Sequence, residues 1–296
     1  MTTDLQLFAV LADSVQPLPV PAGAVDFDSL YDLLPDVALG VYSVLRTFEG
    51  NKFLDLAGHI ARLRQSMVGL GWNDALLDEA ALRQAIHETC TAYPAPEARI
   101  RFDFLAEPAT ALGTSSRLLL CLMPFTPPPP SLYEQGVSLG VAGELGRSNP
   151  SLKTADFARQ RRIYSQQHQG SFYEYLLLDE GGYILEGTGS NFYAVRDGVL
   201  YTAESGILAG ITRRIILNLL PDLNIPLRLE PIHIDDIGQL DEAAMSSSSR
   251  ALLPVVEIEG QTIGNGRPGP ISRRILTAYN DYVAGVVATA VGRVVE

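Results

Sequence analysis

The chain has 296 residues, a mass of 32.0 kDa, 47% hydrophobic residues and a formal net charge of −12. This composition is typical of a globular protein with a large core, and it excludes a disordered chain. The acidic balance argues against nucleic acid or an anionic membrane surface as the main partner, and no stretch approaches the roughly 20 apolar residues of a membrane span.

The N-terminal segment, the cysteines and the histidines narrow the class further. MTTDLQLF at 1–8 contains Asp4 and no basic residue, so we expect no secretory signal. Cys90 and Cys121 have neither metal-site spacing nor the pattern of a disulfide framework, which favours a reducing cytoplasm. The four histidines form no ligand pair at helical or strand spacing, so we expect no metal site.

The first part of the chain predicts a small α+β domain. VYSVLRTFEGNKFL at 41–54 indicates two strands around the EGNK turn. Two helices are expected next, HIARLRQSMVGLGW at 59–72 and ALRQAIHETCTAY at 81–93, because apolar residues recur there every three or four positions. ARIRFDFLA at 98–106 and RLLLCLMPF at 117–125 are expected to be strands.

A proline-rich stretch, MPFTPPPPSLYEQG at 123–136, marks the expected domain boundary. Four consecutive prolines neither continue a helix nor donate to a sheet, so we interpret this stretch as a stiff linker. The sequence therefore predicts two domains, at 1–122 and 137–296.

The second domain is expected to be larger and richer in strands, separated in part by DEGG and RDG turns. The expected strands are VSLGVA at 137–142, YEYLLLD at 173–179, YILEGTGSNFYAV at 183–195, VLYTA at 199–203, EAAMSSSS at 242–249 and PVVEIEG at 254–260. The expected helices are DFARQRRIYSQQHQ at 156–169, ITRRIILNLL at 211–220 and SRRILTAYNDYVAGVVATAV at 272–291.

Lysine is scarce in this chain. Of the 22 residues that are lysine or arginine, only Lys52 and Lys153 are lysines. Arginine is effectively never deprotonated, whereas a lysine amine can lose its proton and act as a nucleophile or base. Lys153, in NPSLKT at 149–154, is therefore a candidate for amine chemistry, although a solvated surface lysine is the commoner role.

Glu186 interrupts an apolar and aromatic strand. A carboxylate taken into a sheet needs a cationic partner or strong hydrogen-bond donors. One interpretation is an ordinary salt bridge with an arginine, and the other is a carboxylate that faces a cationic ligand. Gly187 and Gly189 follow closely and would let another group approach the backbone.

ESGILAGITRR at 204–214 predicts an anion site, because a helix that starts near Gly210 presents free backbone N–H groups. The stretch matches no nucleotide-binding motif. SSSS at 246–249 would add hydroxyl donors, or would simply form a polar loop. An amine, a carboxylate and a phosphate site are together what a pyridoxal phosphate enzyme requires.

These segments resemble the class IV aminotransferases, the fold-type IV pyridoxal phosphate enzymes that include branched-chain aminotransferases, D-amino acid aminotransferases and 4-amino-4-deoxychorismate lyases. The resemblance covers Gly40 to Val256, and five segments in the family's order carry it: HIARL at 59–63, SLKT at 151–154, YILEGTGSNFYAV, LAGITR at 208–213 and MSSSSRALLPV at 245–255. It implies a two-domain α+β fold, pyridoxal 5'-phosphate as cofactor, amino acid and keto acid substrates, and a homodimer.

The resemblance also implies roles for individual residues. Lys153 matches the lysine that forms the Schiff base and then shuttles a proton, and Glu186 matches the carboxylate at the pyridine nitrogen. Arg62, Ile211, Thr212 and Ser248 match the residues that bind the phosphate, and Leu208 matches the residue that packs on the ring.

Substrate recognition is assigned to a second set of residues. Arg99 and Arg101 lie two apart on a strand, so both face the same side and can receive a carboxylate, or they form an exposed strand face. The resemblance places Tyr42 in the side-chain pocket and Ser249 where the backbone meets the substrate carboxylate.

Two departures from the branched-chain pattern leave the substrate open. Ser43 stands where that group usually carries Glu, and Phe157 or Ala158 stands where it usually carries Tyr. We therefore expect an aminotransferase acting on a branched-chain or D-amino acid, and the alternative is the lyase that releases pyruvate. A non-catalytic binding module is a further alternative, but such a protein need not keep Lys153, Glu186 and Arg62.

Overall fold

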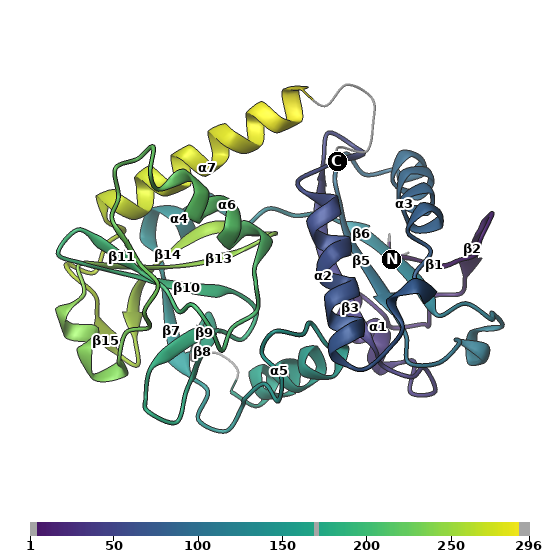
Figure 1. The fold of residues 1–296 in the computed structure, drawn as a ribbon, viewed down its shortest axis with the longest axis horizontal. Helices are drawn as coiled ribbons and strands as arrows, with labels where there is room; N and C mark the ends of the chain where they lie inside the picture. Colours follow the sequence, from purple (N-terminus) through teal and green to yellow (C-terminus); the bar gives the residue numbers. More distant parts are fainter. Residues whose placement is uncertain (1–4, 169–171, 290–296) are drawn as a thin grey trace. The chain divides into compact units, whose positions relative to one another are not determined.

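The computed structural model describes residues 5–168 and 172–289 and divides the chain into two units (Figure 1). The first unit takes its described residues from Met1–Thr126, Leu152–Arg159 and Gly285–Glu296, and the second from Pro127–Ser151 and Gln160–Ala284. One division falls inside the expected linker. Leu152–Arg159 joins the first unit although it follows that linker, and this segment contains Lys153.

The first unit is built on a six-stranded antiparallel sheet with the strand order β2-β1-β6-β5-β3-β4. Its strands are β1 (Gln6–Val10), β2 (Val15–Leu18), β3 (Val41–Phe48), β4 (Lys52–Phe53), β5 (Ala98–Phe104) and β6 (Leu118–Pro124). Its helices are α1 (Phe27–Asp32), α2 (Leu56–Gly69) and α3 (Glu79–Ala92), with short 3-10 turns at Asp74–Leu76 and Thr110–Leu112.

The central strand β6 shows how this sheet is covered. Its apolar run is buried on both faces, as expected of a central strand. Leu118, Leu120 and Leu122 belong to the core that α2 and α3 complete, whereas Leu119 and Cys121 belong to the core that α1 completes. The sheet of the first unit therefore lies between two layers of helix (Figure 1).

The second unit contains a nine-stranded sheet. β9 pairs with both β8 and β10, so the strands β10-β13-β14-β7-β8-β9 close into a ring around an apolar core. The strands are β7 (Val137–Val141), β8 (Glu174–Leu178), β9 (Ile184–Gly187), β10 (Asn191–Arg196), β11 (Val199–Tyr201), β12 (Leu227–Arg228), β13 (Glu242–Ser247), β14 (Ala251–Ile258) and β15 (Gln261–Thr262). The helices are α4 (Pro130–Gln135), α5 (Ala155–Gln167), α6 (Ile211–Leu219) and α7 (Pro270–Thr289), with a 3-10 turn at Ile234–Gln239, and the division between the units passes through α5 and α7.

The structure differs from the expected elements in three ways. The elements β1, β2 and α1, the two-residue strands β12 and β15 and the short 3-10 turns were not foreseen. The expected strand at 183–195 is two strands, because Gly187 N–H donates to the Ser190 carbonyl and turns the chain. Part of the expected linker is helix α4, since proline is well tolerated in the first helical turn.

The remaining expected elements are confirmed to within a few residues at their ends. Residue 169 of one expected helix and residues 290–291 of another lie outside the described residues. In the described part of the chain, none of the helices has the length and apolarity to cross a membrane.

Candidate functional site

Lys153 is held on the edge of the first unit's sheet by its backbone. Tyr42 N–H donates to the Lys153 carbonyl at 3.0 Å, and Ala155 N–H donates to the Gly40 carbonyl at 2.8 Å, so residues 153–155 extend the sheet beside β3. Lys153 N–H also donates to Ser66 Oγ at 3.1 Å. Because Ser66 Oγ donates to the Arg62 carbonyl in α2, this serine joins the lysine segment to that helix.

The side chain of Lys153 lies against Tyr42. Its Nζ is 4.8 Å from the centroid of the Tyr42 ring, and the Arg101 guanidinium lies 4.2 Å from the same centroid. Tyr42 is buried and packs with Ala155 and Ala158. The structure therefore brings together Lys153, Tyr42 and Arg101, three of the residues that the sequence predicted for catalysis and substrate binding.

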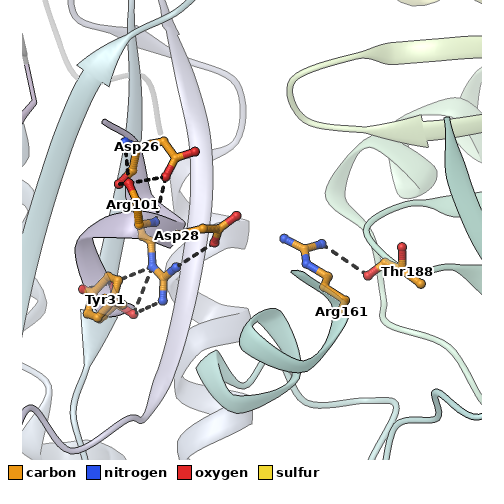
Figure 2. Close-up of polar contacts among 8 residues, drawn as sticks. Asp26, Asp28, Tyr31, Arg101, Arg161 and Thr188 are labelled. Carbon is orange, nitrogen blue, oxygen red and sulfur yellow. Dashed lines mark hydrogen bonds and ion pairs between the residues drawn. The ribbon is translucent and has the colours of Figure 1, made fainter. Parts of the chain in front are cut away.

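Arg101 is buried, with 3% of its side chain exposed, and it forms an ion pair with the fully buried Asp103. Its Nε and Nη2 donate to Asp103 at 2.7 to 3.1 Å, and the Tyr31 hydroxyl donates to the same carboxylate at 2.6 Å. Burial and the neighbouring Asp103 raise the pKa of Tyr31, so the hydroxyl keeps its proton. Figure 2 shows Arg101 between Tyr31 and the half-exposed Asp28, whose carboxylate is 3.9 Å from Nη1.

Arg99 lies on the same face of β5 as Arg101, as the spacing predicted. Its guanidinium lies 5.4 Å from the centroid of the Phe27 ring. The exposed strand face considered for this pair is wrong for Arg101, which is buried, and Arg99 is partly buried.

Arg62 faces the other side of the sheet. It is buried in α2, and its Nη2 donates to Ser43 Oγ of β3 at 3.1 Å. His59, one turn earlier in α2, places Nδ1 2.9 Å from Ser43 Oγ and 3.4 Å from Arg62 Nη2. An exposed helix arginine, the ordinary alternative for Arg62, is therefore excluded.

In the second unit, Glu186 has an arginine partner. Its Oε1 lies 2.9 Å from Arg147 Nε, and both side chains are buried. Its Oε2 accepts a hydrogen bond from the Leu208 N–H at 3.1 Å, and Asn191 Nδ2 donates to the Leu208 carbonyl. Glu186 and Leu208 are thus adjacent. Two groups that contact the same bound aromatic ring, one a carboxylate and the other apolar, would have to be adjacent in this way.

Helix α6 begins at Ile211, immediately after this loop. Gly210 is its N-cap residue, and among the described residues no side chain caps the helix. A Cβ at position 210 would overlap the Asn191 side-chain oxygen, so the loop requires glycine there. Thr212 is buried in the first turn, where N–H groups have no acceptor within the helix. The helix start has the donors that an anion needs.

Ser248 and Ser249 lie in the turn between β13 and β14. Arg250 closes that turn, because its Nε donates to Ser247 Oγ at 2.9 Å while its Nη1 pairs with the buried Glu174 at 2.5 Å. Glu174 also accepts hydrogen bonds from Gly189 N–H and Ser190 Oγ. One ion pair therefore fixes both this turn and the turn at 188–190.

The group that closely approaches the backbone at Gly189 is the protein's own arginine. Figure 2 shows Arg161 of α5, whose Nη1 donates to the Thr188 carbonyl at 3.2 Å, and a Cβ at Gly189 would overlap the same nitrogen. At Gly187, a Cβ would overlap Glu174 and Ser190. The absence of a Cβ at Gly187 and Gly189 therefore leaves room for the side chains of Glu174, Ser190 and Arg161, which all belong to the second unit.

Sequence reasoning missed most of these partners. His59 lies inside the HIARL segment, and Asp103 repeats the spacing of Arg99 and Arg101, so both left a local signal. The residues Tyr31, Arg147, Glu174 and Arg250 left none, because the pairs Tyr31–Asp103, Arg147–Glu186 and Glu174–Arg250 each join residues more than 35 positions apart in the sequence.

Comparisons with known proteins identify the family of this chain. The family model for amino-transferase class IV matches residues 40–258. The chain is 27% identical to a D-alanine aminotransferase of Bacillus licheniformis, covering 85% of this chain and 90% of that protein. It is 38% identical to a branched-chain-amino-acid aminotransferase of Pseudomonas aeruginosa over 50% of this chain and 47% of that protein.

Solved structures show the same fold. The branched-chain amino acid aminotransferase from Escherichia coli superposes with a TM-score of 0.73 at 22% identity, covering 97% of this chain and 98% of that chain. Another branched-chain amino acid aminotransferase, solved with pyridoxamine 5'-phosphate, superposes with a TM-score of 0.75 at 22% identity, covering 95% of this chain and 94% of that chain. The two-domain α+β architecture is therefore that of the fold-type IV enzymes, as the sequence resemblance implied. With a family model that spans most of the chain, the protein belongs to the class IV aminotransferases.

Proposed function

We propose that this aminotransferase uses pyridoxal 5'-phosphate to transfer an amino group between a branched-chain or D-amino acid and a 2-keto acid. The observation that carries the proposal is the placement of Lys153, whose backbone is fixed on the sheet edge while its amine lies against Tyr42. The similarity to D-alanine and branched-chain aminotransferases supports both substrate classes.

The residues present fit this cofactor. A phosphate dianion needs N–H and O–H donors and a positive charge, which the start of α6, Thr212, Ser248 and Arg62 would supply. A protonated pyridine nitrogen needs a carboxylate, which Glu186 would supply. Leu208 would pack on the ring, beside the carboxylate to which its own N–H donates.

When bound, pyridoxal phosphate supplies an electron sink for the carbanion that forms at the substrate Cα. Lys153 would bind the cofactor covalently through Nζ and, once displaced by the substrate amine, would move a proton from the substrate Cα to the cofactor's C4′. Glu186, with Arg147 beside it, would hold the proton on the pyridine nitrogen. Fixing the Lys153 backbone limits the positions that its amine can reach.

The substrate is assigned to the residues around Tyr42. Tyr42 would line the side-chain pocket, the face that carries Arg99 and Arg101 would receive a carboxylate, and Ser249 would offer its backbone. Because Asp103 already pairs with Arg101, a carboxylate at that arginine would share the guanidinium with a protein carboxylate.

The experiment follows the two half-reactions separately. The enzyme is mixed with L- and D-amino acids, including alanine, leucine and valine, and the near-visible band of the bound cofactor is recorded. We expect at least one amino acid to bleach the band, and pyruvate or 2-oxoglutarate to restore it, because a transaminase must pass through the aminated cofactor.

A lyase gives a different result. Colour that persists with every amino acid, together with pyruvate release from aminodeoxychorismate, would replace the proposed reaction with the elimination.

We further propose that the protein is a cytoplasmic homodimer. The free thiols of Cys90 and Cys121 suit a reducing compartment. The dimer rests on the family resemblance, and sedimentation at micromolar concentration would test it.

A further inference from the structure

Three buried polar side chains meet between β3 and α2 of the first unit. Ser43 and His59 are 0% and 1% exposed, and Arg62 is 7% exposed. Strand β3 alternates between its two faces, so Ser43 shares the face of Val41 and Leu45, which pack in the core under α2. A hydroxyl, an imidazole and a guanidinium in such a place need mutual hydrogen bonds.

The donor inventory fixes the direction of each bond. A guanidinium only donates, so Arg62 Nη2 donates to Ser43 Oγ at 3.1 Å and points a second N–H toward His59 Nδ1 at 3.4 Å. We assign the lone pair to Nδ1 and the imidazole proton to Nε2, because Arg62 and Ser43 both lie within hydrogen-bond distance of Nδ1. Ser43 therefore donates its own hydrogen to His59 Nδ1 at 2.9 Å. The bonds run in one direction, from Arg62 through Ser43 to His59.

The surroundings keep His59 in the accepting form. Burial is the main reason that its pKa is lowered, and the positive charges of Arg62 and Lys153 lower it further. A protonated imidazole would have no lone pair at Nδ1 and would repel the guanidinium, so the neutral ring is the form that the arrangement requires.

We propose that Ser43 and His59 are positioning residues, which hold one nitrogen of Arg62 so that the rest of its planar fork meets the phosphate of the cofactor. This inference rests on the proposed function, in which Arg62 binds that phosphate.

The physical gain is preorganisation. An arginine side chain has many rotamers, and ordering one on binding costs conformational entropy. A guanidinium already fixed at Nη2 avoids much of that loss and presents its fork in one plane, which suits two phosphate oxygens. Losing either partner should therefore weaken phosphate binding and leave the remainder of the cofactor's contacts unchanged.

The test compares two ligands that differ only in the phosphate. Cofactor-free enzyme is titrated with pyridoxal phosphate and with pyridoxal, and the ratio of the two dissociation constants is taken for each variant. Ser43→Ala and His59→Gln remove the Ser43 hydroxyl and the Nδ1 acceptor, respectively. Ser43→Thr keeps a hydroxyl, and His59→Asn keeps an acceptor near the Nδ1 position.

We expect Ser43→Ala and His59→Gln to weaken binding of pyridoxal phosphate about 3- to 10-fold, which corresponds to one lost hydrogen bond, without changing the affinity for pyridoxal. Ser43→Thr and His59→Asn should stay close to the wild type. Arg62→Ala should show the largest selective loss, about 10- to 100-fold.

Each other outcome has a definite meaning. If Arg62→Ala loses phosphate selectivity while Ser43→Ala and His59→Gln do not, the positioning role is overturned and the proposed function stands. If Arg62→Ala changes both ligands equally, the phosphate role of Arg62 in the proposed function fails. Equal weakening of both ligands by Ser43→Ala and His59→Gln, with a lowered Tm, would show a structural role only and overturn the inference.

Having two disruptive variants keeps the test usable if one of the two proteins does not fold. Ser43→Ala removes a single oxygen and is the variant expected to fold best, so it carries the test if His59→Gln precipitates. If folded Ser43→Ala keeps the phosphate selectivity of the wild type, that result alone rejects the role of Ser43. It also rejects the proposed series of hydrogen bonds from Arg62 through Ser43 to His59.

Discussion

Lys52 and Lys153 have different surroundings, and the difference predicts different chemistry. Lys52 lies in the β3–β4 hairpin and pairs with the exposed Glu49, where a positive charge is all that is needed. The Lys153 amine lies against the ring of Tyr42, and the backbone of its segment is hydrogen-bonded to the edge of the sheet. An arginine could replace the first but not the second.

Lys153→Ala should therefore abolish turnover and the covalent bond to pyridoxal phosphate, whereas Lys52→Ala should retain both. Borohydride reduction followed by mass spectrometry of the peptides measures the bond directly. Cofactor found on a peptide that contains Lys52, or a wild-type protein saturated with cofactor but not reducible at Lys153, would contradict the assignment.

Asp103 and Arg101 form a buried pair, and breaking it should be costly. Asp103→Asn leaves Arg101 with an uncompensated charge inside the protein, so we expect the free energy of unfolding to fall by about 3 to 5 kcal/mol. Asp28→Asn is the matched control, because Asp28 is half exposed and 3.9 Å from the same guanidinium, and its loss should cost about 0 to 1 kcal/mol. Urea denaturation measures the free energy of unfolding of both variants. Equal losses would mean that Asp103 is not the main group that neutralises the buried charge of Arg101.

At the level of residues, the sequence indicated which side chains are candidates for chemistry better than it indicated which residues contact them. Lys153, Glu186 and Arg62 were chosen by residue type and by resemblance, and their placement agrees with roles that are still proposals. The partners that fix them could not be foreseen, because Arg147 and Glu186 are 39 positions apart and only the folded chain brings them together. A salt bridge for Glu186 was expected, but nothing in the sequence selected one arginine among 20.

Among the elements, the two turns at 188–190 and 247–250 depend on one ion pair. Burial alone would raise the pKa of Glu174, but the charge of Arg250 and the hydrogen bonds from Arg250, Gly189 and Ser190 outweigh it and hold the pKa below its usual value. A carboxyl whose pKa is depressed in the folded state stabilises the fold above its unfolded pKa of about 4.3. That stabilisation is lost as the pH falls through the folded pKa.

Glu174→Gln should therefore lower the free energy of unfolding by about 3 kcal/mol at pH 7, and the difference from the wild type should shrink as the pH falls below about 4.3. Glu180→Gln, at an exposed position of the same unit, is the control and should change little at any pH. Unfolding in urea at several pH values gives the comparison. A difference that stays constant down to about pH 3 would show that the ionised carboxylate contributes no stability.

The elements with strong periodicity were predicted well. α2 and α3 have apolar residues at helical spacing, and β5 and β6 are buried central strands. β2 was missed because it is a short edge strand with Pro17, where a strand pattern is weakest. The ring closure in the second unit depends on one pairing, Asn191 with Glu186, which no local pattern encodes.

For the molecule as a whole, three natural residues report on the unfolding of the first unit. Trp72, the single tryptophan, packs on the core beside Phe104, and Cys90 lies in that same core while Cys121 lies in the core on the opposite face of the sheet. Burial raises the pKa of Cys90 to about 12 and also raises that of Cys121, so neither thiol is reactive in the folded state. All three residues belong to the first unit.

We therefore expect thiol labelling and Trp72 fluorescence to change at the same urea concentration, because both cores share one sheet. Far-UV circular dichroism adds the second unit to the signal, and a later midpoint there would show that the units unfold separately. Cys121 labelled before the fluorescence changes would mean instead that the α1 face opens on its own, and peptide mapping identifies the labelled cysteine.

The scarcity of lysine has a practical consequence for the analytical chemist. A reagent directed at ε-amines has two targets in this chain, and a cofactor bound covalently to Lys153 would shield one of them. Intact mass after mild acylation would then distinguish occupied from vacant subunits, with Lys52 as the reference amine that is present in both. Cofactor loading could be measured in this way on colourless dilute samples, without a substrate.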